Sequence, residues 1–496
     1  MSFQKLLTCS IVLLALITAG CLPQSTTKKA AETQQWMQIL AYQDDDRDPE
    51  RRLAAVRLGV HRRKEAVDLL ARQLIGDRDP LTRAACAFAL GRIGGERAVN
   101  TLIAALNDPA HAVRLEAVRA MDRNVDQKVV PRLLELAAQG DQETSLLAQR
   151  VLDAAGKYPE TPIQRQAVAV PPLPPGPAVY VDPITGDDAN DGSETLPLKT
   201  VAKGLALLKP SGTLFLAGNT KEPIREAVVI PAALSGEPGN PTRIRAWPRK
   251  ARPLLQPTVL IPAKAFTVDS DGLYHAKITQ PVFGAFIVRG PDKIEILTIT
   301  PEKSGLKPGS CWYDLQQTEV ILDPGQQPLT GNVELAINDD ALRIEGAHDV
   351  EIQGLDVRYA PDTGLDASAA LRTSFIDCSA VYCDRHGIFF YYSPFSLARA
   401  CRASKCSYQG FSIRSSPQTV ISSCLAVDNK VDGYLFLYDS DECVIIDSRA
   451  RGNFRGLSFI EGSDDGRVVG GEYQDNQTAA VSFESGSLRG SVVETR

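Results

Sequence analysis

Polar and aromatic side chains recur at 23-residue intervals in the C-terminal part of this sequence. Six of them stand one or two positions before the glycine that marks each interval. They are Arg385, His386, Tyr408, Gln409, Asp432 and Arg455. If the intervals stack as successive coils, these side chains form one strip. Amide, imidazole and phenol groups hydrogen-bond sugar hydroxyls, and arginine pairs with the carboxylates of acidic sugars. We therefore expect this strip to bind a polysaccharide.

Bond-breaking chemistry is a second hypothesis for the same region, in two forms. A polysaccharide lyase needs a general base, for which Lys405 and Lys430 are candidates. A glycoside hydrolase needs two carboxylates, and Asp441 and Asp464 are separated by one 23-residue interval. Adjacent coils lie about 4.8 Å apart, near the roughly 5–5.5 Å carboxyl separation of retaining glycosidases. Whether the protein is an enzyme stays open.

An acidic loop lies near the start of the C-terminal part, in the segment GDDANDG. Its oxygen-bearing side chains belong to Asp187, Asp188, Asn190 and Asp191. Calcium takes roughly six to eight oxygen ligands from flexible loops of this kind. Calcium bound by these four residues is therefore the cofactor hypothesis. No CxxC or Cys/His spacing indicates zinc.

The element that must position the strip is a stack of coils. Five glycines are spaced by 23 residues, and apolar residues follow each at the first and third positions: Gly364, Gly387, Gly410, Gly433 and Gly456. Alternation of this kind is typical of β-strands, and the period is about one turn of a right-handed parallel β-helix. Two cysteine columns keep the same register, the second continued by Asn429. We expect these cysteines to be buried free thiols, because parallel Cβ vectors disfavour a disulfide.

A different period organises residues 36–156. Asp46, Asp77 and Asp108 are spaced by 31 residues, and so are three arginines, of which Arg83 is the second. Each Asp stands in a short turn before an Ala/Leu-rich helix, and a second helix follows. Period and paired helices resemble HEAT-like repeats, in which we expect Asp to cap a helix and Arg to bridge to the next repeat. Residues 157–178 are a proline-rich linker.

The N-terminus carries a targeting segment. Lys5 precedes a short apolar run over 11–17, which is too short to span a bilayer and is typical of a signal peptide. The run ends in Thr18-Ala19-Gly20-Cys21, which resembles a bacterial lipobox whose Cys21 receives the lipid. We therefore expect a signal peptide at 1–21, a polar tether at 22–35 and a membrane anchor made by lipid.

Composition excludes several classes of protein. The 496 residues are 44% hydrophobic and 23% charged, as in an ordinary soluble globular chain. The net charge is −6, and a nucleic-acid-binding protein would show a basic surplus instead. We expect no nucleic-acid partner.

The stretch VYVDPITGDDANDGSETLPLKTVAKGLALLKPSGTLFLAG, from Val179, is similar to the opening of pectate-lyase-like right-handed β-helix proteins. The resemblance continues to about Pro248 and, with the repeats, covers much of residues 179–496. It implies a helix over 198–208 that plugs the N-terminal end of the coil stack. Residues 249–338 lose the interval and resemble the β-rich insertion of some glycosidase-like members.

These features predict a multidomain protein, with a HEAT-like α-solenoid at 36–156 and an all-β right-handed parallel β-helix at 179–496. The function expected is that of an exported, lipid-anchored envelope protein, at the outer membrane or surface of a bacterium. Its β-helix would bind or process polysaccharide, and its helical repeats would bind a protein or act as a spacer. Two alternatives stay open on the same fold, a polysaccharide lyase or glycoside hydrolase and a non-catalytic scaffold or adhesin.

Overall fold

The structure is a computed structural model that describes most of the chain. The described residues are 26–42, 48–121, 128–139, 144, 147–149, 151–152, 177–219, 222–248, 250–290, 293–463, 466–483 and 492–494. The chain divides into two compact units, Met1–Gln166 and Ala167–Arg496. The signal peptide with Cys21 lies outside the described residues, and so does the linker except for its last two residues. Within the described residues, no helix has the length and apolarity needed to cross a membrane.

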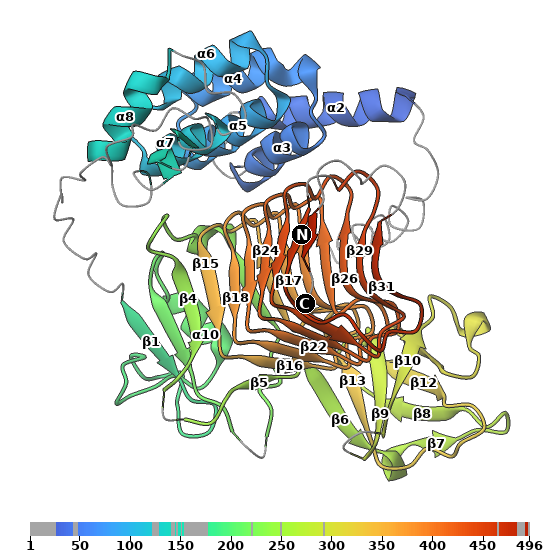
Figure 1. The fold of residues 1–496 in the computed structure, drawn as a ribbon. Coiled ribbons are helices and arrows are strands. Elements are labelled where there is room, and N and C mark those ends of the chain that lie inside the picture. The colour runs from blue at the N-terminus through green and yellow to red at the C-terminus, as the bar shows by residue number, and fades with distance from the viewer. Residues whose placement is uncertain are drawn as a thin grey trace. The chain divides into compact units, whose positions relative to one another are not determined.

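Paired helices build the N-terminal unit (Figure 1). In chain order they are α2 (Thr26–Leu40), α3 (Asp48–Val60), α4 (Val67–Gly76), α5 (Pro80–Ile93), α6 (Glu96–Ala105), α7 (His111–Ala120) and α8 (Val130–Gln139), with a 3-10 turn η2 (Lys64–Ala66) before α4. Helix α3 packs on α5, α5 on α7, and α4 on α6, as in stacked repeats. The segment expected to be a tether is helical from Thr26, because α2 buries Trp36 and Leu40.

The Asp and Arg columns join consecutive repeats. Arg83 donates to both carboxylate oxygens of Asp108, at 2.8 and 2.9 Å, and Arg52 donates to Asp79 at 2.7 Å. Asp79 also caps α5, because it accepts from the amides of Leu81 and Thr82 at 3.2 and 2.9 Å. The bridging role of arginine is therefore confirmed, but the capping role of the repeating Asp is wrong, because the cap of α5 is Asp79, two residues after the repeating Asp77, and α7 has Ala110 at its N-cap and no side-chain cap.

Three parallel sheets form the coil stack of the C-terminal unit (Figure 1). Sheet 1 contains β1 (Ala178–Val181), β2 (Thr213–Leu216), β4 (Thr242–Ala246), β15 (Val350–Gln353), β18 (Ser374–Ile376), β21 (Leu397–Arg399), β24 (Val420–Ser422), β27 (Val444–Ile446), β30 (Arg467–Val469) and β32 (Val492–Glu494). Sheet 2 contains β5 (Leu254–Leu255), β16 (Asp356–Arg358), β19 (Ser379–Val381), β22 (Arg402–Ser404), β25 (Leu425–Val427) and β28 (Arg449–Arg451). Sheet 3 contains β3 (Val228–Pro231), β14 (Leu342–Glu345), β17 (Thr363–Ser368), β20 (His386–Tyr391), β23 (Phe411–Arg414), β26 (Asp432–Leu437), β29 (Arg455–Phe459) and β31 (Ala479–Phe483).

The N-terminal coils carry a helix and an insertion. Helix α10 (Val201–Leu207) packs on the first strands, where the resemblance placed it, and 3-10 turns occur at η4 (Ala232–Leu234), η5 (Ala263–Ala265) and η6 (Lys303–Gly305). The insertion is a mainly antiparallel sheet of β6 (Thr258–Pro262), β7 (Thr267–Val268), β8 (Tyr274–Lys277), β9 (Gly284–Gly290), β10 (Lys293–Ile299), β11 (Ser310–Asp314), β12 (Glu319–Asp323) and β13 (Asn332–Ala336). Strand β5 pairs with β16, so the coil continues beyond the expected boundary at residue 249.

Ladders of like side chains fill the coil interior. Asn429 donates to Asn453 at 2.9 Å, and Asn453 donates to Asn476 at 3.0 Å, so the column of Cys383, Cys406 and Asn429 continues as asparagine. Phenylalanine rings also stack, with centroids of Phe436 and Phe459 4.7 Å apart. The eight cysteines within the described residues are all free and buried, which confirms the expected thiols.

The repeating glycine has a packing reason. A Cβ atom at Gly387 would lie 2.6 Å from the Cβ of Ala403 and 2.7 Å from the carbonyl oxygen of Gly410. The first residues of sheet 3 therefore lie so close to sheet 2 that the glycine position has no room for a side chain. This contact brings the preceding residues of every coil, including the predicted strip, to the same edge.

The cap and ion pair of Asp79 predict a stability effect. Asp79→Ala removes both, and we expect the free energy of unfolding of the helical unit to fall by about 2 kcal/mol at pH 7. Asp79→Asn keeps a capping side chain and should lose less. Chemical denaturation followed by far-UV circular dichroism measures both variants, and equal losses would contradict the capping role.

Acid should weaken the same contact. Burial acts to raise the pKa of Asp79, but Arg52 and the Thr82 and Leu81 hydrogen bonds outweigh it, and the pKa is lowered. The stabilisation is therefore present above the unfolded-state pKa and is lost as pH falls through the folded-state value. Wild type and Asp79→Asn should converge in stability at low pH, and a constant difference would contradict this.

The asparagine ladder predicts a second effect. Asn453→Ala leaves the buried amide of Asn429 and its side-chain NH₂ without their acceptor. Each unsatisfied group costs roughly 1–3 kcal/mol, so the β-helix should lose roughly 2–4 kcal/mol. Denaturation of the full chain, followed by the β-sheet signal, measures this loss. Asn332→Ala, at an exposed position in β13, is the control that should change little.

Candidate functional site

A cluster of carboxyl groups lies at the N-terminal end of the predicted strip. Its members come from the link between β13 and β14, from both ends of β17 and from the turn before β20. They are Asp339, Asp340, Asp362, Asp366 and Asp384. Successive coils bring them together, because the amide of Asp362 donates to the carbonyl of Asp339 at 2.9 Å and the amide of Arg385 donates to that of Asp362 at 3.1 Å. We call this set the carboxylate cluster.

Two arginines pair with part of the cluster. Arg385 lies 3.1 Å from an oxygen of Asp362. Arg343 pairs with Asp340 and, at 2.9 Å, with Asp366. The cluster therefore holds five acidic side chains and two guanidinium groups, and ionisation of every acid would leave an excess of negative charge.

The cluster holds protons more tightly than ordinary aspartates do. Burial raises the pKa of Asp366 to about 6 against the opposing effect of Arg343, and it raises the pKa of Asp340 well above the usual range. Burial also raises the pKa of Asp384 to about 6, with the charge of Asp362 adding to it and Ser407 and Lys430 opposing it. Members of the cluster therefore keep their protons to a higher pH than ordinary aspartates do. Carboxyl groups with raised pKa values are typical of acid–base sites.

His386 adjoins the cluster at the start of β20. Burial lowers the pKa of its imidazole to about 4, although Asp362 acts in the opposite direction. The ring is therefore neutral at pH 7. It contacts Phe389 with centroids 4.9 Å apart and the edge of Tyr408 at 6.4 Å. His386 links the cluster to the aromatic part of the strip.

The rest of the predicted strip differs in exposure. Tyr408 is 50% exposed. Asp432 is fully buried, accepts from Arg455 at 2.6 Å and from Ser458 at 2.8 Å, and receives a weak bond from the buried Gln409 at 3.4 Å. Asp432, Gln409 and Arg455 thus form an internal ion-pair network rather than an open surface. Arg385, His386 and Tyr408 lie together at the cluster.

The predicted catalytic residues lie apart from one another. Lys405 donates to the hydroxyl of Tyr382 at 2.9 Å, and Lys430 is exposed in the next coil. Asp441 is buried in the turn between β26 and β27, at the opposite end of sheet 3 from the strip. Asp464 lies outside the described residues.

The acidic loop uses its oxygens locally. Asp188 accepts from the amides of Lys199 and Thr200 at 3.0 and 2.9 Å and so supports the start of α10. Asp187 and Asp191 accept from amides two residues on, and Asn190 donates to Pro197 at 2.9 Å. Across the described part of the chain, no group of three His, Cys, Asp or Glu side chains is arranged to hold a metal ion.

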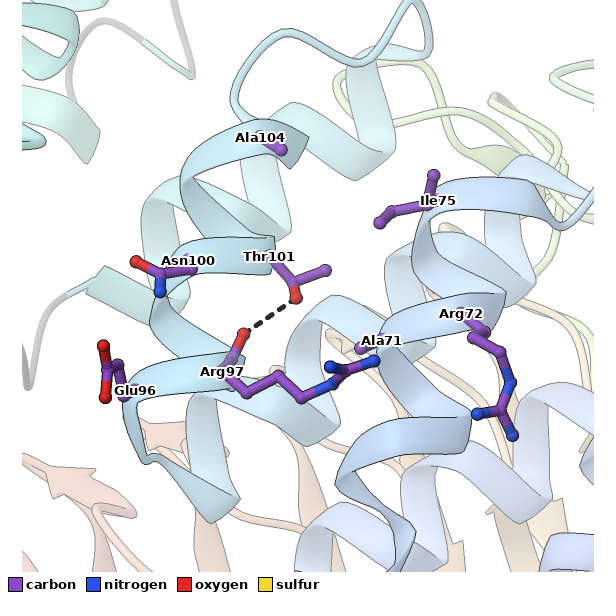
Figure 2. Close-up of a pocket in the computed structure, with 8 residues that line it drawn as sticks. All are labelled: Ala71, Arg72, Ile75, Glu96, Arg97, Asn100, Thr101 and Ala104. Atoms are coloured by element: carbon purple, nitrogen blue, oxygen red, sulfur yellow. Dashed lines mark hydrogen bonds between the residues drawn. The ribbon is translucent and has the colours of Figure 1, made fainter.

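The helical unit carries a groove of about 510 Å³ between α4 and α6. Figure 2 shows Arg97 reaching from α6 toward Ala71 of α4, and the hydroxyl of Thr101 donating to the carbonyl of Arg97 at 2.8 Å. Ile75, on the rim, is 71% exposed. Arg97 pairs with Asp68 at 2.7 Å. The groove is a mixed apolar and polar surface.

Sequence reasoning missed most of the carboxylate cluster, although a signal was present. Asp339 and Asp362 are 23 residues apart, and so are Arg343 and Asp366. The interval therefore extends one coil before Gly364, into the residues that directly follow the insertion.

Comparisons with known families agree with the two units. Residues 33–122 and 67–153 match the family described as HEAT repeats. Residues 320–487 match the family described as right handed beta helix region. No curated protein matches the chain.

Solved structures give remote likenesses. The complex of XylC with xylose has a TM-score of 0.42 and 9% identity, and the match covers 59% of this chain. It covers 66% of the XylC chain, so this protein spans just under two thirds of that structure. A glycoside hydrolase has a TM-score of 0.40 and 10% identity, over 64% and 96%. Pectate lyase Pel9A has a TM-score of 0.31 and 13% identity, over 65% and 79%. Likenesses this remote carry no argument about activity. The family matches and the observed coils together establish that the chain consists of HEAT repeats followed by a right-handed parallel β-helix.

Proposed function

We propose that the β-helix binds a polysaccharide beside Arg385, His386 and Tyr408 and hydrolyses it at the carboxylate cluster. The observation that carries this proposal is Asp384, whose pKa burial raises to about 6, beside Asp362 in its ion pair with Arg385. Glycoside hydrolysis needs one protonated carboxyl and one charged carboxylate on either side of the bond. We assign the protonated role to Asp384, at pH values up to about 6, and the carboxylate role to Asp362, the partner of Arg385.

The chemistry assigns each group a role. Asp384 gives its proton to the glycosidic oxygen as the bond between that oxygen and the anomeric carbon breaks. Asp362 stabilises the positive charge that develops on the sugar ring. Water then adds its hydroxyl group to the anomeric carbon and returns its other proton to Asp384. Arg385 positions Asp362 through their ion pair.

We propose hydrolysis over elimination because the cluster offers a carboxyl group with a raised pKa, Asp384. Of the two candidate bases for elimination, Lys405 donates to Tyr382 and lies 5.1 Å from the centre of its ring, and it would have to leave both contacts. The other, Lys430, is exposed, and its charge opposes the raised pKa of Asp384. Calcium has no part in the proposed step.

A panel of polysaccharides tests the proposal. Full-length protein is incubated with xylan, galactan, mannan, polygalacturonate and alginate, and both new reducing ends and the absorbance of unsaturated uronates are followed. We expect reducing ends without a rise in absorbance. A rise in absorbance would mean elimination and would overturn hydrolysis, and no product or retention on any member would count against a polysaccharide function.

Export and anchoring are a separate part of the proposal. We propose that the protein is exported to a bacterial cell envelope and anchored through lipid on Cys21, supported by the lipobox-like sequence. The helical repeats then bind a protein or act as a spacer. Metabolic labelling with a fatty acid should mark wild type and leave Cys21→Ala unlabelled, and equal labelling would contradict the anchor.

Removal of the acid gives the sharpest variant. Asp384→Asn should lower the rate of hydrolysis by at least about 100-fold, because the amide cannot protonate the leaving oxygen. Asp362→Asn should cause a comparable loss. The control is Asp377→Asn, in an exposed turn between sheets 1 and 2, which should keep the wild-type rate. A fully active Asp384→Asn would remove Asp384 from the mechanism.

The proton on Asp384 also predicts pH dependence. Activity should fall as pH rises above about 6, because the acid loses its proton. The raised pKa means that the folded state binds this proton more tightly than the unfolded state. Stability from this group is therefore greatest at low pH and is lost as pH rises through the folded pKa. Asp384→Asn should thus be inactive yet at least as stable as wild type at pH 8, and a large loss of stability would instead indicate a structural role.

A further inference from the structure

An apolar stripe continues from the carboxylate cluster along the axis of the coils. It consists of Tyr408, Val431 and Phe454, one residue from each of three successive coils. Tyr408 is 50% exposed and Phe454 is 42% exposed, among turns that are otherwise rich in charged residues. Val431 is half-buried between them.

Backbone hydrogen bonds fix the stripe in line with the cluster. The amide of Tyr408 donates to the carbonyl of Arg385 at 3.0 Å, that of Val431 to Tyr408 at 3.1 Å, and that of Phe454 to Val431 at 2.8 Å. The same ladder runs back from Arg385 to Asp362 at 3.1 Å. Asp362 and Phe454 therefore occupy one column, four coils apart, which is about 19 Å.

Polar groups flank this stripe on both sides. The preceding column contains Asp384, Ser407 and the exposed Lys430. In the following column His386 and Arg455 are partly exposed, whereas Gln409 and Asp432 between them are buried. An apolar line between hydrogen-bonding lines matches a pyranose chain, whose rings have apolar C–H faces and hydroxyl groups around their rims. Aromatic rings bury such faces well.

The insertion limits where a bound polysaccharide can lie. Phe286 of β9 contacts Tyr359 with ring centroids 5.1 Å apart, and a Cβ atom at Gly284 would lie 2.9 Å from Pro361, the neighbour of Asp362. The insertion thus abuts the coil beside the carboxylate cluster. In the other direction, toward Phe454, the aromatic rings of the column are exposed.

We propose that Tyr408 and Phe454 are stacking platforms for successive parts of a linear polysaccharide that lies along the coil axis, with its reacting end at the carboxylate cluster. This inference rests on the proposed function and adds the orientation of the substrate and the residues that select its length. A pyranose chain advances by about one coil spacing per residue, so a short oligosaccharide fills the cluster and Tyr408 without reaching Phe454. Longer chains gain a second platform.

The test uses oligosaccharides of three and eight residues prepared from the panel polysaccharide that the full-length protein cleaves. Binding is measured by calorimetry in the Asp384→Asn background, which prevents turnover. Phe454→Ala should weaken octasaccharide binding about tenfold and trisaccharide binding by less than twofold, while Phe454→Trp should restore the octasaccharide affinity. The control is Leu315→Ala, which removes an exposed apolar side chain of the insertion and should change neither affinity.

The outcomes separate this inference from the function on which it rests. Equal octasaccharide affinity with and without the Phe454 ring would overturn the stripe, while hydrolysis by wild type would leave the proposed function standing. Equal weakening of both oligosaccharides would also overturn it, because Phe454 would then act on the whole site. If wild type neither cleaves nor retains any member of the panel, the function fails and the stripe fails with it.

Discussion

The parallel backbone ladder is the constraint on which the rest of the structure depends. Each coil returns to the same place after one interval, because its amides donate to carbonyls of the coils on either side of it. A residue type repeated at that interval therefore becomes a column with a spacing of about 4.8 Å. The glycine column fixes which residue of each coil begins sheet 3, because sheets 2 and 3 approach too closely there for a side chain. Core, ladders and candidate site all follow from this register.

Stacking is favourable for some side chains and costly for others. Asparagines and phenylalanines gain from it, through amide bonds and ring contacts between coils. Aspartates in one column repel each other, and a buried charge without a partner is expensive. Two effects reduce this cost at the carboxylate cluster. Arg343 and Arg385 form ion pairs with Asp366 and Asp362. Burial also raises the pKa of Asp366 and Asp384, so these side chains lose their protons at a higher pH. The raised pKa values of these aspartates thus follow from the coil geometry.

The repeats could be predicted from sequence because their signals are periodic. The 23-residue glycine register, the 31-residue Asp and Arg columns and the free thiols are all present in the structure. The site was predicted only in part. Arg385, His386 and Tyr408 lie where chemistry is plausible, but the strip was expected to face outward throughout, and Asp432 is buried in an ion pair with Arg455. Exposure at a turn depends on packing across coils, which spacing along one chain does not reveal.

The coil register gathers aspartates into a site where Asp366 and Asp384 keep their protons up to about pH 6. Carboxyl ¹³C NMR of protein labelled at aspartate, titrated from pH 3 to 8 with Asp366→Asn and Asp384→Asn for assignment, tests it directly. The account predicts two resonances that titrate near pH 6 and are each lost in one variant. If every aspartate carboxyl titrates near pH 4, the cluster is an ordinary set of surface acids and the account is contradicted.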